Sequence, residues 1–426
     1  FGRLRPRGDL VLRSMGKASG PMGFANMYDA TFEQIAQGGS RRGANMLVMP
    51  IWHPDVRSFI EAKVEEGVLE QFNFSTAITD DFMEAVEKDT DFDLHFGGRV
   101  HESVSARDLF RLITESAWRR GDPGNLFIDR ANRDNPCPDR YTLEATNPCG
   151  EQWLPPYSNC CLGSINLANF VTEWGTAASY GSFDWVRLAT VTAEATRFLD
   201  DVVDANQYVP EVPELEAAAM GERRIGLGGM GLADAMLKLG IRYGSTEGLA
   251  FASQVTEWMR YHSMIASIER AADRGPFEWI DGSIYDPKLL NEHGFGAFAI
   301  DGLDGKGHSL WEAPKPLDTY HHEFDFGRPS PDWTVVEAGL LEHGIRNACQ
   351  FTYAPTGTIS NVAALEGSGC EPLFALVYTR MMVQAAADNV DTKLNYFSGL
   401  FQEALERSEH WRVVEMDKDT WLDAVL

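Results

Sequence analysis

Three features are scarce or absent in this sequence, and each excludes a class of protein. Only 6 of its 426 residues are cysteine, too few for a fold held together by disulfides. No apolar run approaches the roughly 18 residues that span a bilayer, and no signal-peptide pattern opens the sequence. Acidic residues outnumber basic ones by 63 to 37, so the formal net charge is -26 and no broad basic face is available for nucleic acid. We therefore expect a cytoplasmic protein with reduced cysteines that binds neither nucleic acid nor membrane.

Short apolar segments alternate with helical patterns along most of the chain. The segment MLVMPIW at 46–52 predicts a buried strand, and apolar residues at helical spacing follow over 53–67. ACQFTYAPTGTIS at 348–360 predicts another buried strand that ends in a turn. Further helices are expected within 79–122, with Thr79 as N-cap, and over 183–204 and 245–274. This alternation is typical of an α/β architecture with a mostly parallel sheet.

One long segment departs from this alternation. Residues 281–333 are rich in Gly, Pro and His and show little periodicity. They are expected to form a long insertion or a lid-like loop.

Most of the chemically reactive side chains lie in residues 145–167, ATNPCGEQWLPPYSNCCLGSINL. Pro148 disfavours a helical conformation at Asn147, so an extended segment is expected. Side chains alternate along an extended segment, which would point Asn147, Cys149 and Glu151 to one side. A carboxylate can act as general base, an amide can orient a hydroxyl group, and a thiol can carry out redox or radical chemistry. The three together predict a catalytic site, whereas a lone cysteine is more often a small packing residue.

A vicinal pair, Cys160 and Cys161, follows this group. Neighbours on a strand face opposite ways, so only one of the two should share the side of Cys149. Cys137, Cys349 and Cys370 have no evident partner in the sequence and are expected to be packing residues.

The string TNPCGEQ-x-LPPYSNCCLGSINL resembles the active-site loop of ribonucleotide reductases. Its Pro-Cys-Gly-Glu form is most similar to the class II, adenosylcobalamin-dependent branch. Other segments resemble further parts of the family and follow in its order, up to about residue 380. They are GGSRRGANMLVMPIWHPDVRSFIEAK, NFSTAITDDFMEAV, GDPGNLFIDRANRDNP, RRIGLGGMGLADAM, GIRNA-x(5)-APTGTIS and GSGCEPLFALVYTR.

The resemblance implies a role for each residue of the loop in a radical reaction on a ribonucleotide. Cys149 matches the thiyl-radical cysteine that takes hydrogen from the ribose 3′ carbon, and Glu151 matches the carboxylate that deprotonates the 3′ hydroxyl. Asn147 matches the amide that hydrogen-bonds the sugar. Cys160, rather than Cys161, matches one of the two reducing cysteines, which supply two electrons by closing a disulfide.

A second segment, APTGTIS at 354–360, can be interpreted separately. Small and hydroxyl residues around a glycine let backbone N–H groups approach an anion, although a plain turn at a strand end is the alternative. The resemblance implies a substrate-phosphate loop, with Arg41 and Arg42 assisting it or contacting the base; for the two arginines a solvated turn is the alternative. The implied substrate-binding residues are Asn147, Pro148, Cys149, Gly150, Glu151, Pro355, Thr356, Gly357, Thr358, Ile359, Arg41 and Arg42.

The resemblance also implies a fold, a cofactor and partners. The fold would be the family's ten-stranded α/β barrel, forming one catalytic domain over residues 1–426, with Cys149 on a loop threading its centre. The cofactor would be adenosylcobalamin, because radical generation is beyond side chains alone. The implied partners are a ribonucleoside diphosphate or triphosphate, a dNTP or ATP effector, a thioredoxin-like reductant and a second copy in a homodimer.

The sequence departs from the family at both ends. The second reducing cysteine of the family precedes an Arg-Leu-Arg-Pro element, which here is residues 3–6. Relatives also continue beyond the last matched segment. We therefore expect a fragment or a split-gene product, with the rest supplied by flanking segments or by a companion chain.

Two alternatives and one negative expectation remain. The chain could be a catalytically silent nucleotide-binding or assembly subunit. It could also be an NAD(P)-dependent oxidoreductase that uses the GxGxxG run at 226–231, although a glycine run at a helix–helix or helix–sheet contact is favoured because GERR before it does not look like a buried strand. His321 and His322 lack a second well-spaced ligand pair, so no metal site is expected.

Overall fold

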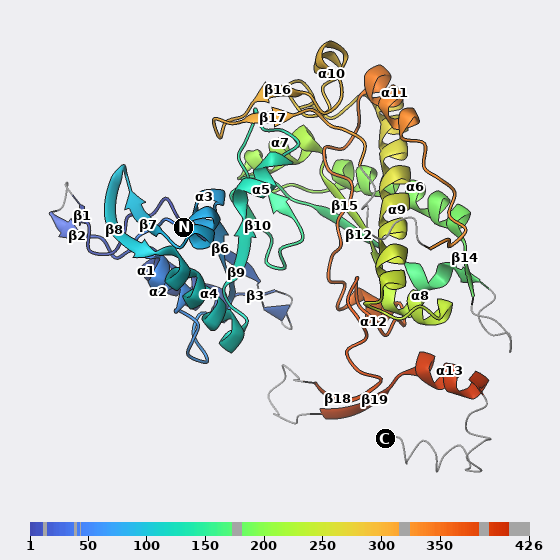
Figure 1. Ribbon diagram of the computed structural model, residues 1–426, viewed down its shortest axis with the longest axis horizontal. Coiled ribbons are helices and arrows are strands. Elements are labelled where there is room, and N and C mark those ends of the chain that lie inside the picture. Colours follow the sequence, from blue (N-terminus) through green and yellow to red (C-terminus); the bar gives the residue numbers. More distant parts are fainter. Residues whose placement is uncertain are drawn as a thin grey trace. The chain divides into compact units, whose positions relative to one another are not determined.

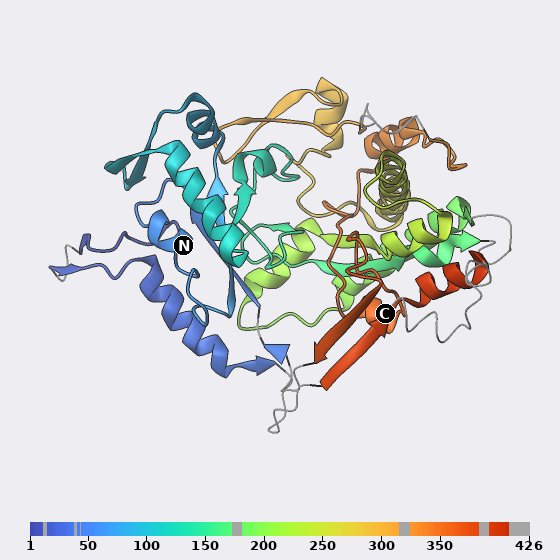
Figure 2. The same cartoon turned by 60° about the horizontal axis from the view of Figure 1, so that its bottom comes forward.

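The structure is a computed structural model that describes residues 1–11, 15–37, 41–42, 44–172, 181–314, 324–382 and 392–408. The chain divides into two compact units. Unit 1 comprises Phe1–Ser158 and Phe298–Ser309, and unit 2 comprises Asn159–Ala297 and Leu310–Leu426. Figures 1 and 2 show their elements. None of the helices in the described ranges combines the length and the apolar character that crossing a bilayer requires.

Unit 1 is built around a parallel sheet of three strands in the order β5-β6-β9. These strands are β5 (Asn45–Pro50), β6 (Phe72–Ile78) and β9 (Gly124–Phe127). The other elements of unit 1 are β1 (Leu10–Val11), β2 (Gly16–Lys17), α1 (Pro21–Gln34), β3 (Ala36–Gln37), β4 (Arg41–Arg42), α2 (Val56–Ile60), α3 (Asp80–Lys88), β7 (Asp91–Phe96), β8 (Arg99–Ser105), α4 (Ala106–Arg120), α5 (Ile128–Arg133), β10 (Ala145–Thr146), β11 (Trp153–Leu154), β16 (Phe298–Asp301) and β17 (Gly307–Ser309).

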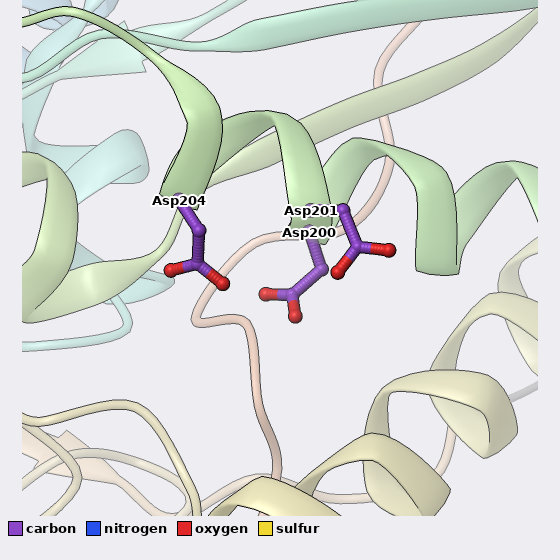
Figure 3. Close-up of side chains that lie close together, drawn as sticks. All are labelled: Asp200, Asp201 and Asp204. Carbon is purple, nitrogen blue, oxygen red and sulfur yellow. The ribbon is translucent and has the colours of Figure 1, made fainter.

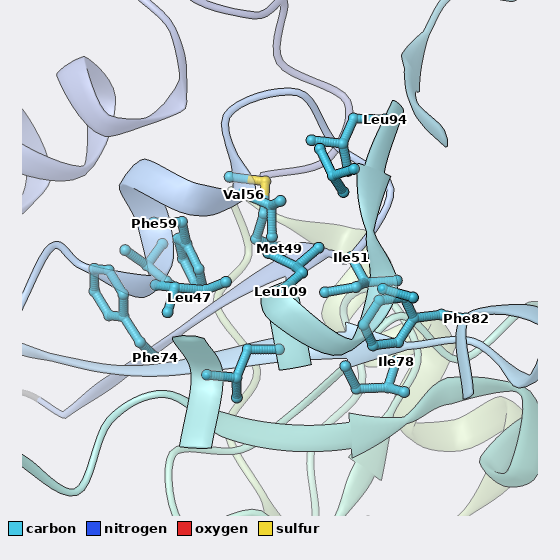
Figure 4. Packing of buried hydrophobic residues seen from close by; sticks show 14 of the residues in the cluster. Leu47, Met49, Ile51, Val56, Phe59, Phe74, Ile78, Phe82, Leu94 and Leu109 are labelled. Atoms are coloured by element: carbon cyan, nitrogen blue, oxygen red, sulfur yellow. The ribbon is translucent and has the colours of Figure 1, made fainter. Parts of the chain in front are cut away.

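The main core of unit 1 is purely apolar and lies on one face of this sheet. Leu47 and Met49 of β5 alternate onto that face and pack with residues of α2, α3 and α4 (Figure 4). Phe59 of α2 stacks on Phe74 of β6, with 4.5 Å between the ring centroids. Helix α4 starts at a side-chain cap, since Ser105 accepts a hydrogen bond from the N–H of Asp108.

Unit 2 contains a parallel strand pair, β12 (Cys161–Asn166) and β15 (Ile225–Met230), whose register joins Leu162 to Gly226. A parallel bridge from Leu227 to Phe351 adds a third extended segment on the other edge of β15. Two long helices, α6 (Trp185–Ala205) and α9 (Thr246–Arg274), pack against each other (Figure 1).

The other elements of unit 2 are short helices and antiparallel strands. They are the 3-10 helix η1 (Leu167–Phe170), β13 (Val171–Thr172), β14 (Ser182–Phe183), α7 (Pro213–Glu222), α8 (Leu232–Leu239), α10 (Pro287–His293), α11 (Trp333–His343), α12 (Ile359–Val362), β18 (Val377–Met382), β19 (Thr392–Phe397) and α13 (Gly399–Ser408).

The mixed α/β class, with parallel strands in the core of each unit, confirms the expected α/β fold class. Thr79 does occupy the N-cap of α3. The helix expected over 53–67 is shorter, because only Val56–Ile60 is helical and turns follow it. The stretch 281–333, expected to be one long loop, contains α10 and the hairpin β16–β17 in its described part.

Candidate active site

Three of the four residues predicted to be catalytic, Asn147, Cys149 and Glu151, lie at the tip of a β-hairpin in unit 1. Strands β10 and β11 pair antiparallel, with Thr146 opposite Trp153, so residues 147–152 form the tip. The N–H of Gly150 donates to the carbonyl oxygen of Asn147 at 3.0 Å, and Gly150 has a φ of +86°. The prediction of an extended segment is therefore wrong for these residues. Instead of alternating along a strand, these residues follow a turn, in which the positive φ of Gly150 favours glycine.

Asn147 closes this tip with both its backbone and its side chain. Its N–H donates to the carbonyl oxygen of Gln152 at 3.2 Å, and its Oδ1 accepts from the N–H of Gln152 at 3.0 Å. The amide oxygen thus holds the loop in shape, and the amide NH₂ is the part of the side chain with donors to offer a sugar hydroxyl.

A polar contact and an apolar layer attach the hairpin to the sheet of unit 1. Asn73 of β6 donates from Nδ2 to the carbonyl oxygen of Pro148, next to Cys149, at 2.7 Å. Val48, Ala77 and Leu126 form a small buried cluster, one residue from each sheet strand. Ala145 and Trp153, at the two legs of the hairpin, pack against this cluster. The tip is therefore anchored at its base by apolar burial and at its end by one hydrogen bond.

Exposure differs among the three side chains of the tip. Cys149 is exposed, whereas Asn147 and Glu151 are half-buried. An exposed thiol flanked by a half-buried amide and carboxylate can meet a bound molecule while its neighbours remain fixed.

A cavity of about 1100 Å³ lies in unit 1 beside this hairpin. Its lining is mainly apolar and comes from α1, β5 and β10. It also includes Pro148, the residue before Cys149. Representative lining residues are Tyr28, Phe32, Met46, Val48, Thr146 and Pro148. A cavity of this size accommodates a ligand as large as a nucleotide.

Cys160 and Cys161 lie in unit 2 and have different surroundings. Cys161 begins β12 and packs against the apolar core of that unit. Burial raises the pKa of the Cys161 thiol, although Arg223 partly offsets the effect. Cys160 precedes the strand, is half-buried and has its Sγ beside Gly226 of β15. The two neighbours therefore have separate environments, and Cys161 is the packing residue.

The segment 354–360, also in unit 2, forms a turn that leads into α12. Thr356 adopts a φ of +51°, which is rare for a β-branched residue and indicates a conformation imposed by its surroundings. Its Oγ1 is buried and has no hydrogen-bond partner among the described residues. Pro355, Gly357, Thr358 and Ile359 are exposed around it.

Some predicted positions lie outside the described residues or differ from expectation. The backbones of Arg41 and Arg42 form β4, but their side chains lie outside the described part, as do His321 and His322. Most of the glycine run 226–231 is strand β15 itself. Gly226 and Gly228 approach neighbouring extended segments, as a contact between strands, whereas Gly229 approaches Leu167 of η1. In a dinucleotide fold the glycines lie in the turn after the strand, so this placement does not favour the NAD(P) alternative.

The remaining cysteines divide between buried and exposed. Cys137 is fully buried, and Cys349 accepts a hydrogen bond from Nη1 of Arg224 at 2.9 Å. Cys370 is exposed, so its assignment as a packing residue is wrong. It follows Gly367-Ser368-Gly369, a stretch whose composition favours an exposed loop.

A cluster of carboxylates on α6 was not predicted. Asp200, Asp201 and Asp204 bring oxygen atoms within 4.8 Å of one another (Figure 3). Asp200 contacts Arg223 at 2.8 Å and Arg270 at 3.0 Å. Burial alone would raise the pKa of Asp200, but Arg223 and the hydrogen bond from Arg270 outweigh it and lower the pKa. Since arginines already neutralise these carboxylates, the cluster is an ion-pair network of unit 2.

Sequence reasoning did not identify the contacts that two residues, Asn73 and Gly226, make with the segments carrying the candidate cysteines. Asn73 lies far from the hairpin in sequence, and nothing in its surroundings marked it as a partner of Pro148. The glycine run around Gly226 did indicate close packing in the sequence. The segment that packs against Gly226 could not be identified without the strand register.

Comparison with known proteins gives a consistent result. Residues 1–420 match the family model of the ribonucleotide reductase barrel domain. The chain is 37% identical over 389 residues to a vitamin B12-dependent ribonucleoside-diphosphate reductase of Mycobacterium tuberculosis, covering 90% of this chain and 46% of the relative. It is 36% identical over 383 residues to the protein of the same name from Thermoplasma acidophilum, covering 89% and 42%. A ribonucleoside-diphosphate reductase subunit alpha of Chlamydia trachomatis is 27% identical over 414 residues, covering 88% and 37%. The chain thus spans less than half the length of these relatives.

Proposed function

We propose a function from the premise that this chain belongs to the ribonucleotide reductase family. The proposed reaction is the reduction of ribonucleotides to 2′-deoxyribonucleotides, the precursors of DNA, by a class II, adenosylcobalamin-dependent oxidoreductase. The observation that carries the proposal is the hairpin tip. It presents an exposed Cys149 between a half-buried amide and a half-buried carboxylate, beside a cavity large enough for a nucleotide.

The tip residues divide the chemistry among themselves. Cys149, as a thiyl radical, takes the hydrogen atom from the ribose 3′ carbon, and Glu151 accepts the proton of the 3′ hydroxyl. Asn147 donates from its amide NH₂ to the sugar, because its Oδ1 already accepts from Gln152. Loss of the 2′ hydroxyl as water then becomes favourable.

The electrons come from thiols. Overall, a ribonucleotide and two thiols give a deoxyribonucleotide, one disulfide and one water, so the two electrons that reduce the 2′ carbon are those lost when the S–S bond forms. Cys160 is proposed as one of the two thiols, and a second cysteine thiol is the other. A thioredoxin-like dithiol reductant then reopens the disulfide by thiol–disulfide exchange.

The remaining substrate contacts are proposed for the turn before α12. Thr356 has a buried Oγ1 with no partner among the described residues, and Gly357 leaves open space where a side chain would be. Both features suit a phosphate group of the substrate, whose oxygens accept hydrogen bonds from hydroxyl and backbone N–H groups. Pro355, Thr358 and Ile359 complete this turn. Arg41 and Arg42 are proposed to contact the phosphate or the base.

The cofactor proposal fits the residues around the hairpin tip. Adenosylcobalamin would supply the radical by homolytic cleavage of its cobalt–carbon bond. Such a bulky group needs a thiol that it can approach, and Cys149 is exposed at the end of its loop. The contribution of the chain is to hold that thiol in place through Asn73 and the turn at Gly150.

At the level of architecture, we propose the ten-stranded α/β barrel of the family, as a single catalytic domain over residues 1–426. The hairpin would be the loop that threads its centre. A homodimer and a dNTP or ATP effector are proposed as further partners, together with flanking segments or a companion chain.

The proposal is tested by assaying conversion of ribonucleoside diphosphates and triphosphates in the presence of adenosylcobalamin and a dithiol. Cys149→Ser should abolish turnover, because a hydroxyl does not form the required radical, while nucleotide binding remains. Cys137→Ser is not a suitable control because Cys137 is buried; Cys370→Ser, at an exposed cysteine, is the matched control and should keep activity. Full activity of Cys149→Ser would refute the radical role, and nucleotide binding by the wild type without reduction would favour a silent binding subunit.

A further inference from the structure

The space beside Cys160 exists because β15 has no side chain at position 226. A Cβ built on Gly226 would lie 2.6 Å from the Sγ of Cys160, 2.7 Å from Cδ2 of Leu162 and 2.8 Å from Cγ2 of Thr352. Real Cβ atoms essentially never lie within 3.0 Å of such neighbours. The Cys160 thiol therefore lies where the Cβ of any other residue at position 226 would be.

The neighbours of Gly226 are all ends of side chains, which distinguishes it from Gly228 on the same strand. A Cβ at Gly228 would lie 1.9 Å from the carbonyl oxygen of Thr352, a backbone atom. A side chain at 228 would therefore collide with the backbone of a neighbouring segment. A side chain at 226 would instead collide with the side chains that fill the space beside it. Of these side chains, only that of Cys160 carries a reactive group.

We propose that Gly226 is a positioning residue for the Cys160 thiol, a role that rests on the proposed reduction of ribonucleotides. The missing side chain lets the Sγ of Cys160 lie against β15 in one orientation. A methyl group at 226 forces the thiol into another staggered rotamer, which moves the sulfur by about 3 Å. A disulfide needs an S–S distance of about 2.05 Å with a narrow range of dihedral angles, so a shift of this size takes the thiol out of reach of its partner.

The register of the strands supports this assignment. Leu162 of β12 pairs with Gly226 and Gly163 pairs with Leu227, so the two glycines 163 and 226 face opposite sides of the pair. The three atoms nearest to a Cβ at Gly163 all belong to Leu199 of α6, and the closest of them, Cδ1, lies at 3.1 Å. Gly163→Ala is thus a matched control, because it adds the same methyl group to the same strand pair on the face away from Cys160.

The experiment measures how fast iodoacetamide alkylates each cysteine in the folded chain. Tandem mass spectrometry of the peptides resolves Cys160 from Cys161. Gly226→Ala should change the alkylation rate of Cys160 by about fivefold or more, since the accessibility of a thiol governs its reactivity. The rates of Cys149 and Cys370, and every rate in Gly163→Ala, should stay within about twofold of the wild type. A folded Gly226→Ala chain with an unchanged Cys160 rate overturns the proposal.

A second variant decides the case in which Gly226→Ala does not fold. In Gly226→Ala combined with Cys160→Ala, the added methyl group takes the space that the sulfur has left. Recovery of folding in the double variant, seen as a cooperative thermal transition, supports the proposal because it identifies Cys160 as the clashing partner. Failure of the double variant to fold overturns it, because Leu162 or Thr352, rather than Cys160, would then be the neighbour that excludes a side chain at 226.

The experiments distinguish a failure of the proposed function from a failure of the proposed positioning role of Gly226. Alkylation needs neither nucleotide nor cofactor, so a wild-type chain that reduces no ribonucleotide removes the proposed function and leaves the positioning result intact. If Cys160→Ser abolishes reduction while Gly226→Ala leaves the Cys160 alkylation rate unchanged, only the positioning role is lost.

Discussion

The segments that carry Cys149 and Cys160 are held in place by different forces. In unit 1, Cys149 lies on an exposed hairpin tip that is held, above its apolar base, by a few hydrogen bonds such as that from Asn73 to Pro148. In unit 2, Cys160 lies against β15, a strand whose six residues are all buried. The space for its sulfur is defined by packing around Gly226 rather than by a donor or an acceptor.

This difference fits the tasks proposed for the two thiols. A loop held by a few hydrogen bonds can adjust by small amounts at low cost, since each such bond contributes only about 1 kcal/mol. A thiol enclosed by close-packed side chains cannot adjust without strain. Cys149 must meet a substrate that enters and leaves, whereas Cys160 must meet a second sulfur within a narrow geometry. Perturbing each support in turn tests whether the contrast is real.

Replacing Cys160 should have the largest effect and should separate the two thiols in function. Cys160→Ser removes one of the two thiols that close the disulfide, so multiple turnovers with a protein reductant should stop entirely. Removal of hydrogen from the ribose 3′ carbon depends on Cys149 and should persist, measured as release of tritium from 3′-labelled substrate. Cys149→Ser should lose both signals. An unchanged steady-state rate for Cys160→Ser would contradict the assignment.

The rigidity of unit 2 around Cys160 depends on the ion-pair network of Asp200, which ends next to β15. Asp200 is almost fully buried and contacts Arg223, two residues before the strand, and Arg270 of α9. Asp200→Ala leaves these arginines without their central partner and should destabilise unit 2 by about 3–5 kcal/mol. The measurement is chemical denaturation followed by tryptophan fluorescence.

An exposed ion pair of unit 1 gives the matched control for this prediction. Arg133 contacts Asp80 at 2.8 Å, and both side chains are about half exposed. Arg133→Ala should cost less than about 1 kcal/mol, because solvent screens the pair. Equal losses in the two variants would show that the network does not make unit 2 the more rigid support.

Sequence patterns predicted the periodic parts of this fold better than its turns. Helices α6 and α9 lie where their apolar spacing indicated, and the alternation of strands and helices predicted the class correctly. The five residues from Asn147 to Glu151 were identified as one chemical group, but on an extended geometry that the turn at Gly150 rules out. Local propensity did not reveal that Asn147 would close a turn with Gln152, since that bond exists only once β10 and β11 pair.

Contacts between segments that are distant in the sequence could not be predicted, for a different reason. The bond from Asn73 to Pro148 and the packing of Cys160 on Gly226 both depend on strand register. Register is set by the whole hydrophobic pattern, because a slip of one residue turns every side chain to the other face. The sequence therefore indicated the candidate reactive residues, whereas the residues that support them came from the structure.

For the hairpin of unit 1, which is held by a few hydrogen bonds, we expect a moderate loss of activity when Asn73 is replaced. Asn73→Ala removes the donor to the Pro148 carbonyl and should lower kcat/KM about fivefold, equivalent to about 1 kcal/mol. Alkylation of Cys149 should change at the same time, because its loop loses one anchor. Asn291 donates in the same way to the carbonyl of Pro287 at 2.9 Å, at an exposed helix remote in sequence. Asn291→Ala should therefore leave both readouts unchanged, and an equal loss in the two variants would count against the anchoring role.

Acidification should have the smallest effect and should act first through buried histidines rather than through the ion-pair network. His53 of unit 1 accepts from the N–H of Asp55 at Nδ1, at 3.0 Å, and its Nε2 lies 2.9 Å from the carbonyl oxygen of Leu4. This pattern suits the neutral ring with its proton on Nε2. Burial lowers the pKa of His53 below its usual 6.5, and the hydrogen bond to Leu4 offsets only part of that.

Because the pKa of His53 is lower in the folded state, the unfolded state binds more protons between that pKa and 6.5. Stability should thus be full above 6.5 and decline as the pH falls below it. The pKa of Asp200 is lowered from 3.8, so the network keeps its charge until far more acidic conditions. His262 of unit 2 also has a pKa lowered by burial and should lose stability in the same range as His53. Comparing thermal unfolding at about pH 7.5 and about pH 5.5 should therefore show a smaller loss in His53→Gln than in the wild type, and His262 should contribute to the loss that remains. An identical loss in both proteins would show that His53 is not the group that makes unit 1 sensitive to acid.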